Sequence, residues 1–93
     1  MSLDPIGDFA FNVLDYLLHH ADYQRGLVKL THRRNVVYCY SQRELERELT
    51  RITREVVEKK HGAVPDDLDD IVTNAMDEYG RELHSTYRQA RAS

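Results

Sequence analysis

The stretch LVKLTHRRNVVYCYSQRE, residues 27–44, decides the fold that the sequence predicts. Its two short runs, Leu27–Thr31 and Val36–Tyr40, are rich in β-branched and aromatic residues and flank the polar residues 32–35, which is the pattern of a β-hairpin. The turn contains no Asn-Gly or Asp-Gly pair, and a two-stranded hairpin is only marginally stable in isolation. We therefore expect helices from the rest of the chain to pack against this hairpin.

A helix is predicted directly after the hairpin. Ser41 and Glu44 have the spacing of a capping box, in which a hydroxyl and a carboxylate satisfy free backbone N–H groups at a helix start. Apolar residues then recur at amphipathic spacing: Leu45, Leu49, Ile52 and Val56. Gly62, with Pro65 beyond it, is a stop signal, so the helix is predicted over residues 42–60.

Another helix is predicted before the hairpin. Asp4 and Pro5 suit the cap and the first position of a helix, because proline has no N–H to leave unpaired there. Apolar residues with helical spacing follow, and Gly26 ends the pattern. They are Ile6, Phe9, Ala10, Val13, Leu14, Leu17 and Ala21, with Phe11 and Leu18 widening the apolar face. We expect this helix to be largely buried.

A third helix is predicted from the Val64-Pro65 pair to the last residues of the sequence. One apolar stripe runs along it: Leu68, Val72, Ala75, Tyr79, Leu83, Tyr87 and Ala90. Its charges complement the helix dipole, with Asp66, Asp67, Asp69 and Asp70 in the first turns and Arg81, His84, Arg88 and Arg91 in the last. Gly80 is its weak point and costs about 1 kcal/mol relative to alanine.

The expected fold class is mainly α, and α+β at most, with three amphipathic helices and a short β-hairpin between helices 1 and 2. A chain of 93 residues has material for one hydrophobic core, so residues 1–93 are predicted to form a single domain. Its 41% of hydrophobic residues favours a folded chain over a disordered one. Residues 1–3 join no pattern and are interpreted as an expression remnant.

The composition excludes several classes of function. A formal net charge of −3 and an isoelectric point near 5.9 provide no overall field that attracts nucleic acid or an anionic membrane. The longest apolar runs are far short of the roughly 20 residues that span a bilayer, and the first residues lack the basic start of a secretory signal. The single cysteine, Cys39, cannot form an intrachain disulfide. We therefore expect a cytoplasmic protein that does not contact a membrane.

Arginines of the predicted 42–60 helix form one candidate site. Four of them fall within about 80° of one another at 100° per residue, opposite the apolar stripe. These four, the arginine ridge, are Arg43, Arg47, Arg51 and Arg54, and the hairpin turn adds Arg33 and Arg34. The set is suited to a nucleic-acid backbone. The interpretation that we prefer is a solvated face with i,i+4 ion pairs such as Arg51 with Glu55.

Known DNA-binding and metal-dependent classes fit the sequence poorly. A ribbon-helix-helix protein needs polar side chains on its strand, and residues 36–40 offer no Lys, Arg or Gln, while a winged helix needs a helix-turn-helix before its hairpin. Two acidic pairs, Glu55 with Glu58 and Asp67 with Asp70, faintly resemble those of all-helical nucleotide pyrophosphohydrolases, but helix-start preference explains the aspartates. The histidines show no metal-ligand spacing. We therefore predict no catalytic, cofactor-binding or metal-binding residue.

Tyrosine usage points to an interface. The chain has six tyrosines, two phenylalanines and no tryptophan, and tyrosine suits half-buried surfaces. A continuous helix over residues 66–90 would be about 37 Å long, whereas a domain of this size is about 32 Å across. The overhanging stripe then needs a cover, and a second copy is the commonest one. Tyr79, Leu83 and Tyr87 are the candidate interface residues.

These observations give three hypotheses of function. The first is a non-enzymatic protein-interaction or regulatory module, homodimeric through the third helix. The alternative is a small nucleic-acid-binding regulator that uses the arginine ridge. The third is a metal-dependent enzyme of a class that the sequence does not identify.

Overall fold

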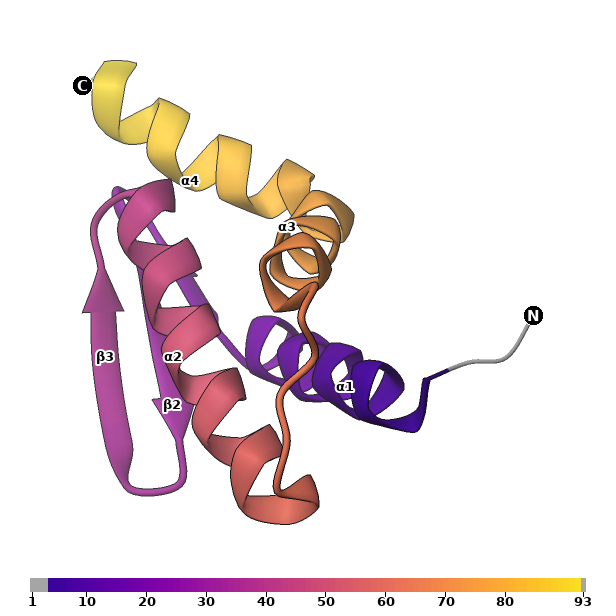
Figure 1. Cartoon of the computed structure of the whole chain (residues 1–93). Coiled ribbons are helices and arrows are strands. Elements are labelled where there is room, and N and C mark those ends of the chain that lie inside the picture. Colours follow the sequence, from indigo (N-terminus) through magenta and orange to yellow (C-terminus); the bar gives the residue numbers. More distant parts are fainter. Residues whose placement is uncertain (1–3, 93) are drawn as a thin grey trace.

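The computed structural model describes residues 4–92, and the side chains up to Tyr87. Residues 1–3 therefore lie outside the described part, as do the side chains of Arg88, Ala90 and Arg91. In chain order the elements are α1 (Pro5–His19), β1 (Asp22–Gln24), β2 (Leu27–His32), β3 (Asn35–Cys39), α2 (Gln42–His61), α3 (Leu68–Glu78) and α4 (Gly80–Ala92). The chain is helix-rich, with a small antiparallel sheet on one side of the helices (Figure 1).

Helix α1 begins where the sequence predicts and ends earlier. The Asp4 carboxylate accepts a hydrogen bond from the Ile6 N–H at 3.1 Å, and Pro5 occupies the first helical position. The helix ends at His19, because the next residues leave it to form β1. There the Tyr23 hydroxyl donates to the Leu18 carbonyl at 2.6 Å and holds the new strand against the helix end.

The predicted hairpin is present, and a third strand extends it. Strand β2 pairs with β3 and also with β1, so the sheet has the order β1-β2-β3 rather than two strands alone. A two-residue turn, Arg33-Arg34, joins β2 to β3, and His32 pairs with Asn35 across it. Arg33 adopts a φ of 58°, a left-handed value that favours glycine or asparagine. The turn is therefore strained at an arginine.

Helix α2 matches its prediction to within one residue. The Ser41 hydroxyl accepts from the Glu44 N–H at 3.1 Å, and the Glu44 carboxylate accepts from the Tyr40 N–H at 2.7 Å. The box thus reaches one residue further back than the standard motif. At the other end, Gly62 takes a φ of 72° and its N–H donates to the Glu58 carbonyl, which closes the helix.

The predicted third helix is wrong as a single element, because the structure has two helices there. Helix α3 begins at Leu68, after a turn at Pro65, and ends at Glu78 with Tyr79 as its cap residue, while α4 begins at Gly80 and runs in a new direction (Figure 1). Helix α4 packs against β1 and β2. Because the helix bends, it does not extend beyond the domain, and the dimer prediction based on the length of a continuous 66–90 helix loses its support.

The core lies between the helices and one face of the sheet. Its buried apolar residues come from all helices and from β2 and β3: Ala10, Leu14, Leu17, Leu18, Val28, Leu30, Cys39, Leu45, Leu49, Ile52, Val57, Leu68, Val72, Ala75 and Leu83. Side chains on the other face of β2 and β3 alternate with these and turn outward. The molecule therefore has one sheet face covered by helices and one facing solvent.

Candidate functional site

Large apolar side chains are exposed along β3. Val36, Tyr38 and Tyr40 are 44%, 51% and 62% exposed, and they alternate with Val37 and Cys39, which face the core. Three of the four large apolar residues exposed in the described part of the chain therefore lie on one strand and the residue that follows it. Singly scattered exposed apolar residues are normal, whereas a row of them marks a contact surface.

The backbone of β3 also has an unpaired edge. In a hairpin with a two-residue turn, the pair flanking the turn exchanges hydrogen bonds, and the pattern alternates along the strands. His32 with Asn35 is that pair, so the N–H and C=O groups of Val36 and Tyr38 point away from β2. No strand of the described chain lies on that side. The edge presents free donors and acceptors beside exposed side chains.

Edge strands are normally protected against pairing, and β3 lacks the usual protection. Charges, prolines, bulges or very short length keep natural edges from pairing. The other edge strand, β1, has only three residues, includes Asp22 and packs against α4. Strand β3 has five residues, contains no charge and no proline, and keeps an unbroken register with β2. Chemically, it is suited to accept an additional antiparallel strand.

The predicted interface residues lie at contacts within the chain. Leu83 is 2% exposed and belongs to the core. The Tyr79 hydroxyl lies 3.0 Å from the Asp15 carboxylate, to which it donates, and the Tyr87 hydroxyl donates to the Cys39 carbonyl at 3.1 Å. Tyr79 thus ties the end of α3 to α1, and Tyr87 ties α4 to the end of β3.

Burial changes the acidity of these groups. It raises the pKa of Tyr87 to about 12, with a smaller contribution from Cys39, and it raises the pKa of Tyr79 to about 12, aided by the hydrogen bond with Asp15. Burial also raises the pKa of the Cys39 thiol to about 11, and nearby Glu48 adds to this shift. A fully buried thiol with a raised pKa is a poor nucleophile at neutral pH.

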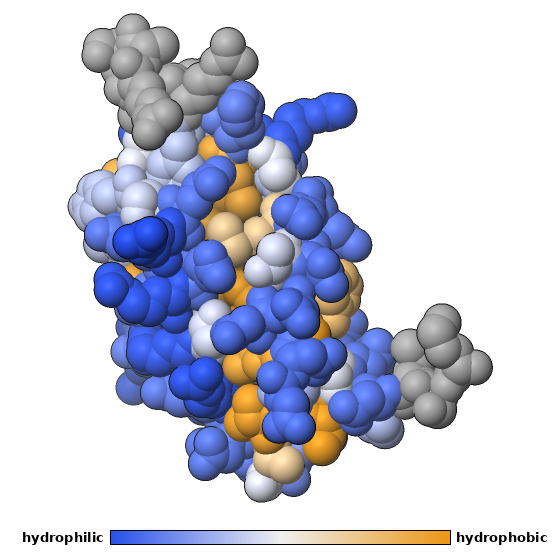
Figure 2. Space-filling model, turned by 45° about the horizontal axis from the view of Figure 1, so that its top comes forward, coloured by the Kyte–Doolittle hydropathy of each residue, from blue (hydrophilic) through white to orange (hydrophobic). Residues whose placement is uncertain are grey.

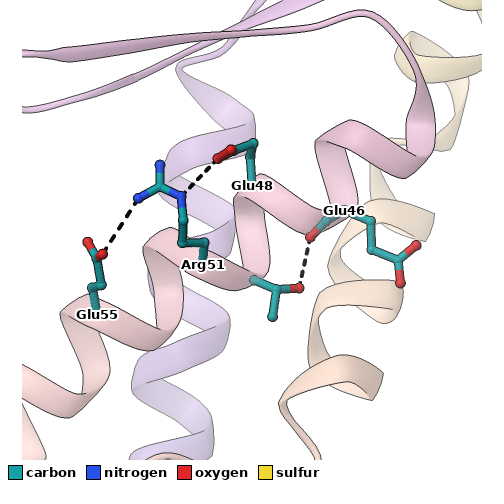
Figure 3. A network of polar contacts seen from close by, with 5 residues as sticks. Glu46, Glu48, Arg51 and Glu55 are labelled. Atoms are coloured by element: carbon teal, nitrogen blue, oxygen red, sulfur yellow. Dashed lines mark hydrogen bonds and ion pairs between the residues drawn. The ribbon is translucent and has the colours of Figure 1, made fainter.

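The arginine ridge lies on the exposed side of α2, and only part of it is engaged. Arg51 bridges two carboxylates, with Nε 2.9 Å from Glu48 and an Nη atom 3.5 Å from Glu55 (Figure 3). All four ridge arginines line one hollow, together with Glu46 of α2 and Asp69 of α3. The face shown in Figure 2 is largely hydrophilic, with apolar residues reaching the surface in a narrow seam. Glu48 and Glu55 on α2 and Asp69 on α3 therefore border the ridge.

The structure separates the turn arginines from the ridge. Arg33 lines a different hollow, beside Lys59 and Lys60 near the end of α2. The acidic residues considered for a metal site have different local roles. Glu55 forms an ion pair with Arg51, whereas Asp67 is the N-cap residue of α3. Among the described side chains, which run to Tyr87, no three His, Cys, Asp or Glu residues cluster so that they could hold a metal ion, and no helix within residues 4–92 is long and apolar enough to cross a membrane.

Sequence reasoning missed the free edge of β3. The alternation of Val36, Tyr38 and Tyr40 with core residues was visible, but strand order decides whether such a row faces solvent at an edge. Comparisons of the chain with protein-family models, with curated proteins and with solved structures give no match. The candidate site therefore rests on the chain's own geometry.

Proposed function

We propose that this protein is a non-enzymatic protein-interaction module that forms a homodimer by pairing β3 with β3 of a second copy. One observation carries the proposal, namely the five-residue, uncharged and unbulged edge strand with exposed Val36 and Tyr38. An exposed edge of this kind is a template for another strand. The partner surface moves from the third helix, where the sequence suggested it, to the sheet.

A two-fold axis makes such pairing self-complementary. It would relate two β3 strands as antiparallel neighbours, joining the two three-stranded sheets into one of six strands. The outward N–H and C=O groups of Val36 and Tyr38 would then find partners. Tyr38 and Tyr40 of both copies would meet on the solvent face, where cross-strand aromatic pairs contribute roughly 0.2–1 kcal/mol each.

Charges at the two ends of β3 favour this arrangement. Arg34 lies at the turn before the strand, and Glu44 lies just after its other end, hydrogen-bonded to Tyr40. Antiparallel pairing brings the turn of one copy beside the Glu44 end of the other. Opposite charges would therefore meet at both ends of the seam, which favours the antiparallel register over a parallel one.

The experiment is sedimentation velocity over a concentration series reaching near-millimolar protein. We expect the wild type to dimerise and Tyr38→Pro, which removes an outward N–H without touching the β2 ladder, to remain monomeric. Tyr38→Thr keeps that N–H and should weaken the dimer only partly. Thr31→Lys is the matched control, because Thr31 is exposed on the same sheet face but belongs to β2, where it lies opposite Val36 and one strand in from the edge.

Two results would refute the proposal. One is a wild type that stays monomeric at every concentration. The other is a dimer that Tyr38→Pro leaves intact while circular dichroism shows the variant to be folded. A dimer broken by Thr31→Lys as strongly as by Tyr38→Pro would indicate stacking of sheet faces rather than edge pairing, and would also count against it.

The arginine ridge supports nucleic-acid binding less well. Arg51 is engaged by two glutamates, and Asp69 shares the hollow that the other ridge arginines line. A phosphate backbone laid along α2 would approach these carboxylates as well as the arginines. We therefore propose the interaction module as the function and retain nucleic-acid binding as the alternative.

The buried single cysteine agrees with our placing the protein in the reducing cytoplasm.

A further inference from the structure

A groove runs between α1, the turn of the hairpin and the second half of α2. It consists of two adjoining hollows of about 480 and 430 Å³ that share Phe9, His32, Arg33 and Val56. Each volume lies within the range of roughly 300–1,000 Å³ that small-molecule sites occupy. The groove reaches the hairpin turn and Asn35, the first residue of β3, but Val36, Tyr38 and Tyr40 of the free edge do not line it, so use of the groove does not require dimer formation.

One end of the groove is apolar. Helix α1 supplies Val13, Leu17 and the ring of Tyr16, which is 60% exposed. Phe9 continues this floor toward the other end. From Phe9 to Leu17 the helix rises about 12 Å, so the floor is long enough for a hydrocarbon chain or a pair of rings. Nothing in this half of the groove is charged except Arg33, where the two hollows meet.

The other end is cationic. Arg33, Lys59 and Lys60 line it, and the one carboxylate among its lining residues, Glu55, lies 3.5 Å from Arg51 outside the groove. Lys60 Nζ lies 5.1 Å from the centre of the Phe9 ring, so this cation sits over the apolar floor. Within the described residues, neither Arg33 nor Lys59 has a carboxylate partner. Two cations therefore remain available to an anion.

We propose that this groove binds a small amphipathic carboxylic acid, with its apolar part on Phe9, Val13 and Val56 and its carboxylate between Arg33 and Lys59. The polarity of the groove carries the argument, because an apolar end and a cationic end match a ligand with a single anionic head. An acidic peptide would need cations spread along its length. The cations of this groove lie from the junction of the two hollows, at Arg33, to one end, at Lys59 and Lys60, and the α1 half beyond Arg33 has none.

The experiment is a titration of the full chain with decanoate, followed by two-dimensional amide NMR below the micelle concentration. We expect saturable shifts at Phe9–Leu17, at His32 and Arg33, and at residues 55–60. Decanol is the matched probe, since it keeps the chain and lacks the anion, and it should bind about tenfold more weakly. An acidic peptide without apolar residues should cause no saturable shift.

Variants locate the two parts of the ligand. Arg33→Asn with Lys59→Gln should weaken decanoate binding about tenfold, and asparagine tolerates the left-handed backbone at position 33. Arg43→Gln with Arg47→Gln removes the same charge on the ridge and should change the affinity less than twofold. Tyr16→Ser should weaken decanoate and decanol alike, because it shortens the apolar floor.

Absence of saturable shifts with decanoate would overturn the inference. So would equal binding of decanoate and decanol, equal weakening by the ridge variants, or binding of the acidic peptide at the same residues. The monomer–dimer equilibrium is measured separately by sedimentation, so failure here is distinguishable from failure of the proposed edge pairing.

Discussion

Thr53 is an unusual residue in the core. Its side chain is fully buried on α2, and its Oγ1 atom has no hydrogen-bond partner within the described residues. A buried hydroxyl without a partner costs about 1–3 kcal/mol of desolvation, whereas an apolar group of similar shape carries no such cost. Its position four residues after Leu49 and four before Val57 puts Thr53 on the buried face of α2, although a threonine does not belong to the apolar stripe.

We predict that Thr53→Val raises the free energy of unfolding by about 1 kcal/mol. Urea unfolding followed by circular dichroism measures this value. Thr73→Val is the matched control, because Thr73 is exposed and its hydroxyl donates to the Asp69 carbonyl at 3.0 Å. The control should change stability by less than half a kcal/mol in either direction. Destabilisation by Thr53→Val would mean that the hydroxyl is satisfied in solution.

At the scale of an element, the bend between α3 and α4 is set by packing rather than by glycine. Gly80 does not adopt a positive φ, and a Cβ built on it would meet no atom within 4 Å. Beyond the bend, buried Leu83 and the hydrogen-bonded Tyr87 hold α4 against the sheet. An alanine should therefore fit position 80 and leave the bend in place.

We predict that Gly80→Ala raises the free energy of unfolding by roughly 0.5–1 kcal/mol, because glycine loses more conformational freedom on folding. The amide NMR spectrum should keep its peaks for Leu83–Tyr87 nearly unchanged. Leu83→Ala, which removes the packing, should instead lower stability by about 2–5 kcal/mol. Large shifts throughout α4 in Gly80→Ala would show that the glycine itself determines the bend.

Local signals explain which elements could be predicted. Helix α2 has a capping box at Ser41 and a left-handed glycine at Gly62, so the sequence predicts both of its ends. The sequence does not predict the break at Tyr79, because the apolar stripe keeps its helical spacing across the break. The direction of α4 depends on its packing against the sheet. Strand β1 has three residues, Asp22–Gln24, too few to show an alternation, and it exists because β2 lies beside it.

The candidate sites were harder to predict than the elements, because they depend on which strands and helices lie side by side. The sequence identified the exposed arginines of α2, but it grouped Arg33 with them, and the fold places Arg33 in the groove with Lys59. It assigned Tyr79 and Tyr87 to an interface, where the structure gives their hydroxyls partners within the chain. Long-range contacts of this kind have no local pattern.

At the scale of the whole molecule, three tyrosines make the free energy of unfolding depend on pH in the alkaline range. Burial raises the pKa of Tyr23, Tyr79 and Tyr87 above the ordinary value of about 10. Below that value these tyrosines are protonated in both the folded and the unfolded state. As the pH rises from about 10 through 12, the unfolded state loses its protons first, so the free energy of unfolding falls. The Cys39 thiol, whose pKa burial raises to about 11, adds to the decline and begins to do so at a lower pH, because an unfolded thiol ionises before a tyrosine.

We predict a loss of roughly 2–3 kcal/mol between pH 9 and pH 11, measured by urea unfolding at each pH. Tyr79→Phe with Tyr87→Phe should lower stability at neutral pH and make this decline shallower, because two of the linked groups are gone. Tyr16→Phe, at an exposed position on α1, should keep the slope of the wild type. An equal slope in all three proteins would contradict the linkage.

The backbone hydrogen bond from Gly26 to the Thr86 carbonyl, at 3.0 Å, has a consequence for synthesis. The sheet leaves the ribosome long before α4, which packs on β1 and β2. Until then the nascent chain carries a hairpin whose core face is only partly covered, next to an uncharged edge strand. Such intermediates are prone to aggregate, so chaperone protection should matter most in the interval before residue 86 emerges.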